Sequence, residues 1–377
     1  MNKHIVLLVS GIVAVGTSHL SAASASSGSS SEVASAVERG KSWLASRQTE
    51  NGAWEPVKYP AITAMALMAC NEGAGKNRAQ PDFVKKGYAY LLNCARPDGG
   101  FYTGTNYQNY NTSWTLNALA VSGRKEDAAL IQKARPLISS WQIDLDEEGK
   151  RDNPLDGGIG YGDGTPRANL ANTLAPLQAL YETRAFAGAN ESKINREALL
   201  DFLHRTQNSS AVNREAYVCE DTANGGGFMY HPGKSFAGEV KMPNGQAGYR
   251  SYGSMTYAGL LCYFYAGVDQ KAPEVQGALE WARRHFTVEE NPGMDDQGLY
   301  YYYHLMARAL AAYNVDKIKT ADGKTVDWRE ALSRKLLALQ KPDGSWVNAE
   351  GRWMEDNPVL CTAYALMALN VISQGAR

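Results

Sequence analysis

The chain has no marked excess of positive or negative residues. Its 377 residues include 38 Lys and Arg against 39 Asp and Glu, which gives a formal net charge of −1. Proteins that bind nucleic acid or anionic membranes usually carry a strongly basic surface. The composition therefore indicates neither kind of partner.

Cysteine is scarce and irregularly spaced. The five cysteines are an odd number, and no two of them form a CxxC pair, which weighs against a zinc ribbon and against a CxxC redox motif. Cys70, Cys262 and Cys361 stand in apolar segments, where cysteine usually acts as a small buried side chain. A Cys70–Cys94 disulfide is the alternative if the chain reaches an oxidising compartment.

A hydrophobic run long enough to span a membrane is also missing. The apolar run Ile5 to Val15 is too short for a comfortable span, but it follows Lys3 and His4 and precedes the small residues Ala23-Ser24-Ala25. This order is typical of a secretory signal peptide over residues 1–25, with a Ser-rich lead-in over 26–31. We therefore expect an exported protein, periplasmic or extracellular, with no integral membrane span.

What the chain does have is a pattern that returns six times: a helix with one polar face, a turn that usually carries Gly and an aromatic residue, and a nearly uncharged helix. The mean spacing of the turns is about 58 residues, which suits two helices with a structured connection. The turns are Gly52-Ala53-Trp54, Asp98 to Phe101, Asp156 to Tyr161, Gly225 to Phe228, Gly298-Leu299-Tyr300 and Asp343 to Trp346.

The second helix of each pair is expected to be buried on nearly every side. Residues Ala61 to Cys70 and Val359 to Ile372 contain no charged residue, and Asn357 followed by Pro358 is typical of a helix start. Further inner helices are predicted after Asn111-Thr112, and over 254–266 and 299–313. Pro136 and Pro176 fall inside helical patterns, so we expect kinks there.

Helices with one polar face alternate along the chain with nearly uncharged helices. This alternation predicts two concentric layers, with the uncharged helices inside. Neither the first nor the last pair resembles a polar cap, so a closed ring is favoured over an open solenoid. The predicted fold is all-α: a single α/α toroid of six helical hairpins over residues 32–377.

Two of the turns resemble a known repeat. Lys341 to Trp346, preceded by Leu339-Gln340, and Gln48 to Trp54 are similar to the QW-type repeats of the squalene–hopene cyclase and protein prenyltransferase superfamily. Residues 251–257 and 352–358 also resemble exported bacterial proteins described as prenyltransferase/squalene oxidase repeat-containing. The resemblance covers the mature chain and implies the α/α toroid, but repeats alone do not transfer a reaction.

The residues on which the two known chemistries depend are missing. Class II terpene cyclases protonate their substrate with a DxDD motif, which this sequence lacks; Met294-Asp295-Asp296-Gln297 is among the nearest strings. Protein prenyltransferases bind zinc through Asp, Cys and His. Tyr303-His304 resembles the His position, but Tyr252 to Met255 stands where the family has Asp-Gly-Cys-Tyr. One His cannot build a zinc site, so we expect no metal and no cofactor.

Some residues remain candidates for a site. Tyr300, Tyr303 and His304 share one helix face at spacings of three and four, whereas Tyr301 and Tyr302 point elsewhere. If the shared face lines a central cavity, it offers an aromatic wall that stabilises cations and one titratable base. The alternative is a packed inner helix whose hydroxyls reach water.

Two acidic pairs, Asp295 with Asp296 and Glu355 with Asp356, precede inner helices. Because the inner helices of a toroid run roughly parallel, both pairs are expected at one rim, where they are candidates for acid, base or catalytic carboxylate. The alternative is that they only face the positive ends of the helix dipoles.

Arg250, Tyr252, Arg352 and Trp353 flank the same helix starts. They are candidates to hold an anionic or sugar ligand, with simple coverage of the rim as the alternative.

Three functions follow from these observations. The first is an exported toroid related to terpene cyclases and prenyltransferases that binds or acts on an isoprenoid or other apolar small molecule in an aromatic cavity. The second is a carbohydrate-active toroid, either a polysaccharide lyase or a hydrolase, because rim acids beside aromatic residues suit sugar chemistry. The third is a binding scaffold without catalysis.

Overall fold

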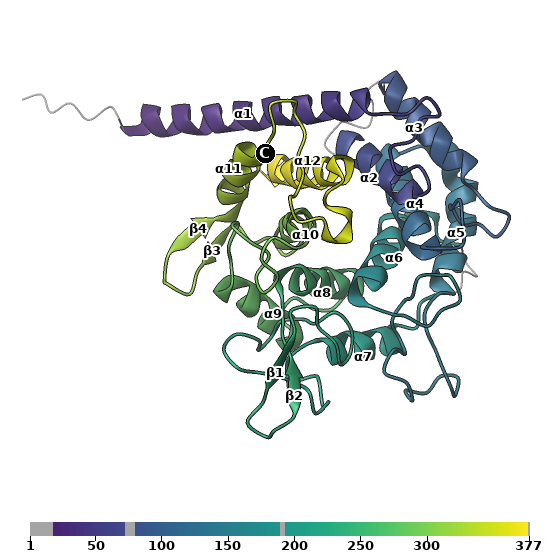
Figure 1. The fold of residues 1–377 in the computed structure, drawn as a ribbon, viewed down its shortest axis with the longest axis vertical. Helices are drawn as coiled ribbons and strands as arrows, with labels where there is room; N and C mark the ends of the chain where they lie inside the picture. Colours follow the sequence, from purple (N-terminus) through teal and green to yellow (C-terminus); the bar gives the residue numbers. More distant parts are fainter. Residues whose placement is uncertain (1–17, 72–79, 189–192, 376–377) are drawn as a thin grey trace, which may run out of the picture.

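The computed structural model describes residues 18–71, 80–188 and 193–375, and in these ranges the chain forms two concentric rings of helices (Figure 1). The inner ring consists of α2 (Pro60–Asn71), α4 (Gln108–Ser122), α6 (Leu170–Glu182), α8 (Gly253–Tyr265), α10 (Leu299–Ala312) and α12 (Pro358–Gly375). The outer ring consists of α1 (Ser18–Ser46), α3 (Asp82–Asn93), α5 (Ala128–Ser139), α7 (Arg196–Thr206), α9 (Pro273–Arg284) and α11 (Trp328–Leu339).

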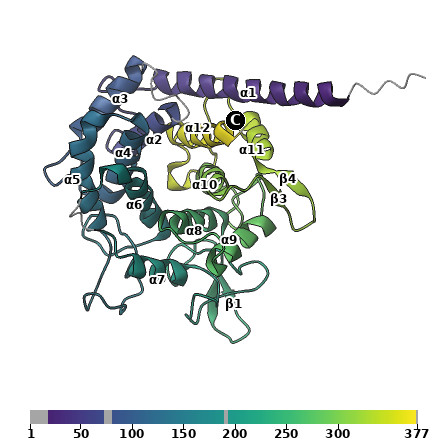
Figure 2. The same cartoon turned by 180° about the vertical axis from the view of Figure 1, so that it is seen from behind.

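The inner ring is closed. Each inner helix packs against the next in chain order, and α12 packs against α2, so the last hairpin contacts the first. The view from behind shows the same closed circle, with α1 extending past the body of the ring (Figure 2). The prediction of an all-α toroid with inner and outer layers is confirmed.

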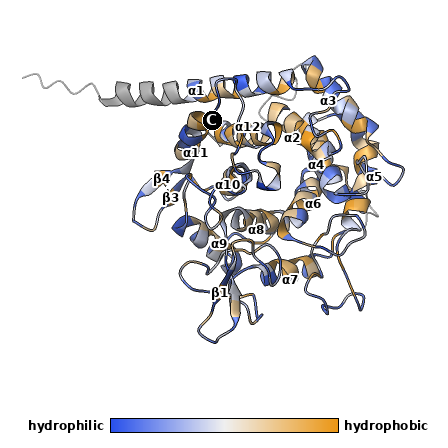
Figure 3. Cartoon of the chain, in the orientation of Figure 1, coloured by the Kyte–Doolittle hydropathy of each residue, from blue (hydrophilic) through white to orange (hydrophobic). Residues whose placement is uncertain are grey.

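The two rings differ in hydropathy as the sequence predicts. The inner helices are mostly hydrophobic, whereas the outer helices alternate between apolar and polar residues (Figure 3). In α2, all residues from Pro60 to Cys70 are buried. A helix buried on every side needs apolar residues around its whole circumference, whereas an outer helix needs them on one face only.

A recurring hydrogen-bond pattern explains the Gln and Trp of the turns. Gln340 at the end of α11 donates through Nε2 to Gly344 O (2.9 Å) in its own turn and to Ala36 O (2.9 Å) on α1. Gln48 joins its turn to α3 in the same way, through Gly52 O and Phe83 O. Each glutamine therefore ties one hairpin to the next, and Gln340 closes the ring between the last outer helix and the first.

The turns also pack against their own inner helices. The backbone N–H of Trp54 donates to Thr63 Oγ1 (3.1 Å), and that of Trp346 donates to Thr362 Oγ1 (3.0 Å). The turn glycines permit a close approach: a Cβ at Gly344, whose φ is +95°, would lie 2.7 Å from Arg39 O on α1. A residue with a side chain would push these two segments apart.

Most predicted boundaries of the inner helices agree with the structure within one or two residues. Asn357 is the N-cap of α12, because its Oδ1 accepts from Val359 N (2.8 Å). The exception is α4, which begins at Gln108, before the expected start at Asn111-Thr112. Pro136 and Pro176 lie inside α5 and α6, as their helical patterns indicated.

The structure adds short elements that the sequence did not indicate. Two antiparallel hairpins pair β1 (Glu239–Lys241) with β2 (Ala247–Tyr249) and β3 (Lys317–Lys319) with β4 (Thr325–Asp327). Three 3-10 turns are η1 (Lys125–Asp127), η2 (Arg184–Phe186) and η3 (Arg352–Met354).

The N-terminal predictions are only partly visible in the structure. The expected Ser-rich lead-in, 26–31, lies within α1. Residues 1–17 of the expected signal peptide lie outside the described residues. In the described ranges, no helix is both long enough and apolar enough to cross a membrane. All five cysteines are free and buried, so Cys70 and Cys94 form no disulfide.

Candidate ligand-binding cavity

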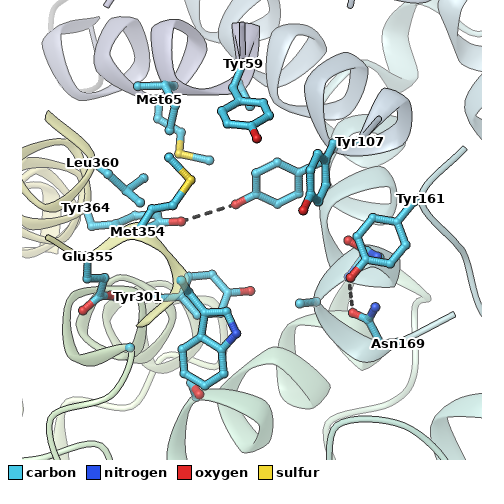
Figure 4. Close-up of a pocket in the computed structure, with 18 of the residues that line it drawn as sticks. Tyr59, Met65, Tyr107, Tyr161, Asn169, Tyr301, Met354, Glu355, Leu360 and Tyr364 are labelled. Atoms are coloured by element: carbon cyan, nitrogen blue, oxygen red, sulfur yellow. Dashed lines mark hydrogen bonds between the residues drawn. The ribbon is translucent and has the colours of Figure 1, made fainter. Parts of the chain in front are cut away.

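A cavity of about 280 Å³ lies inside the inner ring, near the N-terminal ends of its helices. All six inner helices contribute residues from their first turns or from the position just before them. Figure 4 shows Tyr59, Tyr107 and Tyr161 on one side of the cavity and Tyr301, Met354 and Tyr364 on the other. The lining also includes Ala61, Ile62, Met65, Tyr110, Asn111, Asn169, Ala171, Asn172, Tyr230, Tyr252, Ser254, Met255, Gly298, Trp353, Glu355 and Leu360.

The inner part of the cavity is aromatic and uncharged. The hydroxyls of Tyr110 and Tyr364 lie 3.3 Å apart, and the Tyr301 ring packs on Tyr364 at 5.6 Å between centroids. Burial raises the pKa of all three phenols, so they stay neutral at physiological pH. Beneath them, His304 stacks on Tyr364 (5.4 Å) and contacts Trp114 (6.0 Å). This part of the wall therefore offers aromatic faces and hydroxyls.

Six aromatic side chains surround the outer part of the cavity, and we call them the aromatic collar: Tyr59, Tyr107, Tyr161, Tyr230, Phe236 and Trp353. Tyr107 contacts both Tyr59 (5.6 Å) and Tyr161 (5.4 Å) edge to face. Phe236 contacts Tyr230 (4.4 Å) and Trp353 (5.7 Å). Five of the six line the cavity directly; Phe236 joins two of them. The collar forms the mouth, since its members are exposed or half-buried.

Two collar residues adopt an unfavourable backbone conformation. Tyr107 (φ 58°) and Trp353 (φ 57°) are both in the left-handed region, and they are 41% and 43% exposed. Non-glycine residues seldom adopt this conformation, and such strain clusters at binding and active sites. Gly298 leaves room for Trp353, because a Cβ there would lie 3.1 Å from the indole. The mouth is thus built at a local cost in backbone energy.

Glu355 is the one carboxylic acid among the described residues that line the cavity. It is buried beside the N-terminus of α10, where its Oε1 accepts from Tyr301 N (2.8 Å) and its Oε2 from Tyr300 N (3.2 Å). Asn348 Nδ2 also donates to Oε2 (2.8 Å). Burial raises the pKa of Glu355, an effect that outweighs the lowering by these hydrogen bonds. Glu355 is therefore a buried carboxyl group that is held by three donors.

Three predicted site residues line the cavity: Glu355, Tyr252 and Trp353. Tyr300, Tyr303 and His304 do not, which corrects the expectation that their shared face lines it. Tyr301, which was expected to point elsewhere, lines the cavity instead. The hydroxyl of Tyr303 donates to Val288 O (2.6 Å) in the segment that follows α9, so this ring packs toward the outer layer. His304 is buried below the tyrosine layer.

The two acidic pairs do not converge at one rim of the cavity, although the sequence had predicted that they would. Asp295, Asp296 and Asp356 are exposed and do not line the cavity, which leaves Glu355 as the acid that reaches it. The turn before α10 places both aspartates outward, and Asp295 itself has a φ of 51°. In the part of the chain that the structure describes, no three His, Cys, Asp or Glu side chains are placed to hold a metal ion.

The two predicted arginines lie outside the lining. Arg250 is exposed and donates from Nε to Glu239 O (3.3 Å) on β1. Arg352 stacks on Trp353 (4.5 Å) and Phe236 (4.8 Å) and bonds to Gln297 Oε1, so it supports the collar from outside.

The chain matches no protein-family model and no curated protein sequence. Solved structures do match. The ligand-free type II terpene cyclase MstE from Scytonema has a TM-score of 0.52 at 14% identity, over 92% of this chain and 99% of that chain. A variant of that cyclase with its substrate geranylgeranyl dihydroxybenzoate has a TM-score of 0.53 at 14% identity, over the same shares. A protein from Actinoplanes has a TM-score of 0.51 at 16% identity, over 90% of this chain and 99% of that chain.

These identities establish the fold alone. The chain has the α/α-toroid fold that is also seen in the type II terpene cyclase MstE, and this is the fold that the resemblance of its turns implied.

Proposed function

We propose that this protein binds an isoprenoid or another apolar small molecule in its central cavity. The observation that carries the proposal is the cavity lining: tyrosines and a tryptophan together with Ile62, Met65, Met255 and Leu360, drawn from the ends of helices that form a closed ring. Cavities of this kind bind ligands mainly by burying apolar surface, and a few polar groups fix their orientation.

Glu355 gives the cavity a proton-transfer group within this proposal. It lines the wall, its pKa is raised by burial, and it stands among neutral phenols. A buried carboxylic acid whose pKa is raised is suited to exchange a proton with a bound ligand. The toroid fold of the type II terpene cyclases supports a ligand of isoprenoid type, although this chain lacks their DxDD motif.

The proposal is tested by filling the cavity. Purified protein is incubated with a lipid extract and, separately, with an oligosaccharide panel, and native mass spectrometry identifies what stays bound. Ala171 lines the cavity from α6, so Ala171→Phe is expected to abolish retention of an apolar ligand. The matched control is Ala312→Phe, at the C-terminal end of α10 and outside the lining, which should retain the ligand.

Each outcome assigns a function. Retention of an isoprenoid that is lost in Ala171→Phe alone supports the proposal. Retention of an oligosaccharide would replace it with the carbohydrate-active alternative, for which the exposed rings of Tyr107 and Trp353 are suitable stacking surfaces. If neither class binds, the toroid is a scaffold and the proposal is wrong.

We also propose that the protein is exported. The support is the sequence of the first 25 residues, with a basic start, an apolar run and a small-residue cleavage pattern. Expression in a bacterium followed by intact-mass measurement of the periplasmic and cytoplasmic fractions tests this. Cleavage after Ala25 is the expected result, and an uncut chain in the cytoplasm would contradict it.

A further inference from the structure

Three asparagine side chains line the cavity, and we call them the amide wall: Asn111, Asn169 and Asn172. Asn111 belongs to the first turn of α4, Asn169 directly precedes α6, and Asn172 lies in the first turn of α6. Because α4 and α6 pack against each other, the three carboxamides come from neighbouring helices. They are only 1%, 2% and 5% exposed. Figure 4 shows Asn169 on the side of the cavity opposite Glu355.

Backbone donors fix the orientation of two of these amides. Ala61 N donates to Asn111 Oδ1 (3.1 Å), and Asn172 N donates to Asn169 Oδ1 (3.0 Å). Because a backbone N–H can only donate, the side-chain atom that faces it must be the oxygen, and the NH₂ group takes the other side of the amide. The oxygens of Asn111 and Asn169 are therefore occupied, and their NH₂ groups are the ends that remain for the wall.

Asn172 differs from these two because its amide nitrogen is unused. Its Nδ2 is buried and has no hydrogen-bond partner among the described residues. A buried donor without a partner reduces stability, so its presence in an inner helix calls for an explanation. Asn109 shows the usual arrangement, since its Nδ2 donates to Gly160 O (2.7 Å) and to Asn172 O (2.9 Å). Asn172 therefore brings an unpaired donor to the cavity wall.

The rest of the lining favours a neutral ligand. No Lys, Arg or His is among the described residues that line the cavity, and Glu355 is their one acid. An anionic ligand would therefore lose its hydration without gaining a cation inside the cavity. A carbonyl oxygen has two lone pairs and no hydrogen, so it accepts from NH₂ groups without bringing a donor that must itself be satisfied. The amide wall is thus complementary to a carbonyl group.

We infer that the ligand is a neutral apolar molecule with a carbonyl group, that is, an aldehyde, a ketone or an ester, whose oxygen accepts a hydrogen bond from Asn172 Nδ2. The inference rests on the proposed function, because it assumes that the apolar part of the ligand fills the same cavity. Binding of such a ligand pairs a donor that the free protein leaves unpaired. A buried polar group of this kind discriminates against analogues that lack the matching atom. Asn172 is therefore a residue that determines specificity.

The experiment compares ligands with one carbon skeleton: the terpenoid ketone geranylacetone, the alcohol obtained by reducing it, and the hydrocarbon in which CH₂ replaces the carbonyl group. Isothermal titration calorimetry measures the affinity of each for the purified wild-type chain and for Asn172→Leu. The ligands differ in their hydration in water, so the effect of the substitution is compared instead of the affinities themselves.

We expect the ketone to bind about tenfold more weakly to Asn172→Leu than to wild type, which is the effect of losing one buried hydrogen bond. The hydrocarbon should bind equally well or better to the variant, because leucine adds an apolar surface to the wall. The alcohol should lose less than the ketone, since its hydroxyl can turn to the phenols of the cavity instead.

Asn117→Leu is the matched control. Asn117 lies on α4 and is fully buried, and neither its Nδ2 nor its Oδ1 has a partner among the described residues, but it does not line the cavity. Either substitution removes a buried unpaired amide at nearly constant volume, so we expect both variants to be at least as stable as wild type in thermal unfolding. A loss of ketone affinity in Asn172→Leu alone therefore reports contact with the ligand.

The outcomes separate the two proposals. A loss that is specific to the ketone and absent in Asn117→Leu supports the inference. An equal effect of Asn172→Leu on all three ligands would overturn it and leave the proposed function standing, because the amide wall would then hold only water. A larger loss for the alcohol than for the ketone would overturn the assignment to a carbonyl group. If none of the three ligands binds to wild type, both proposals are wrong.

Discussion

The substitution Glu355→Gln measures how the protein holds a carboxyl group inside its cavity wall. Three donors, Tyr301 N, Tyr300 N and Asn348 Nδ2, bond to the two carboxyl oxygens. A glutamine has one oxygen. In its best orientation, with that oxygen in the place of Oε2, it retains two of the bonds and turns its NH₂ group toward Tyr301 N. One buried donor is then left unsatisfied, which costs about 1–3 kcal/mol of unfolding free energy.

The pH dependence of this cost has a definite sign. Because burial raises the pKa of Glu355 in the folded state, the folded protein binds a proton more tightly there than the unfolded chain does. The contribution of Glu355 to stability is complete below the unfolded pKa of about 4.3 and decreases as pH rises through the folded pKa. The glutamine variant has no such titration. The stability difference between wild type and Glu355→Gln should therefore be largest below the unfolded pKa of about 4.3 and narrow as pH rises through the folded pKa.

The assay is urea unfolding of both proteins at a series of pH values, followed by circular dichroism. Asp356→Asn is the matched control: it changes the neighbouring acid, which is exposed, and should alter stability by less than about 0.5 kcal/mol. A difference that grows with pH would refute the reasoning. It would mean that the donors and the α10 dipole outweigh desolvation, so that Glu355 is held as a carboxylate and is not suited to donate a proton.

Two further substitutions test the buried histidine of α10 and the N-terminal cap of α12. Burial, with a smaller effect of Arg308, holds the pKa of His304 well below its ordinary range, so the folded protein should lose stability as pH falls through the unfolded-state pKa of about 6.5 and the unfolded chain takes up a proton. His304→Phe should remove that loss in acid unfolding curves, and an unchanged slope would show that His304 is charged or solvated. Asn357→Ala removes the N-cap of α12 together with a hydrogen bond to Glu55 O, and should cost about 1 kcal/mol by urea unfolding. No change in the midpoint would show that the cap is dispensable.

The fold was predictable because its determinants are local and repeated. The uncharged run from Ala61 to Cys70 can exist only where neighbours cover every face, and Asn357-Pro358 marks a helix start in any context. The start of α4 was placed too late because that helix begins in a polar segment, Gln108 to Asn111, with no capping side chain at Tyr107. Apolar periodicity says little about such a helix end.

The site was harder to predict because it depends on how each inner helix is rotated about its own axis. The neighbouring residues Tyr300, Tyr301, Tyr302 and Tyr303 differ in direction by about 100° a residue, and the pattern of four tyrosines does not reveal which one faces the cavity. The structure selects Tyr301, since the hydroxyls of Tyr302 and Tyr303 bond to Thr287 O and Val288 O. A signal in the sequence did exist: Tyr59, Tyr107 and Tyr252 each directly precede an inner helix.

The aromatic collar also departs from the rules that relate sequence to local structure. The residue directly before the inner helix lines the cavity in five of the six hairpins, and in two of them it is a collar residue, Tyr59 or Tyr107. Tyr107 and Trp353 are the two large hydrophobic residues that are exposed among the described residues, and both have a left-handed backbone. Exposure of an apolar ring and strain in its backbone each reduce stability, and folding alone gives no reason to combine them twice around one cavity. A ligand that covers both rings when it binds would remove the free-energy cost of exposing them to water. We therefore assign the collar to ligand binding rather than to the stability of the toroid.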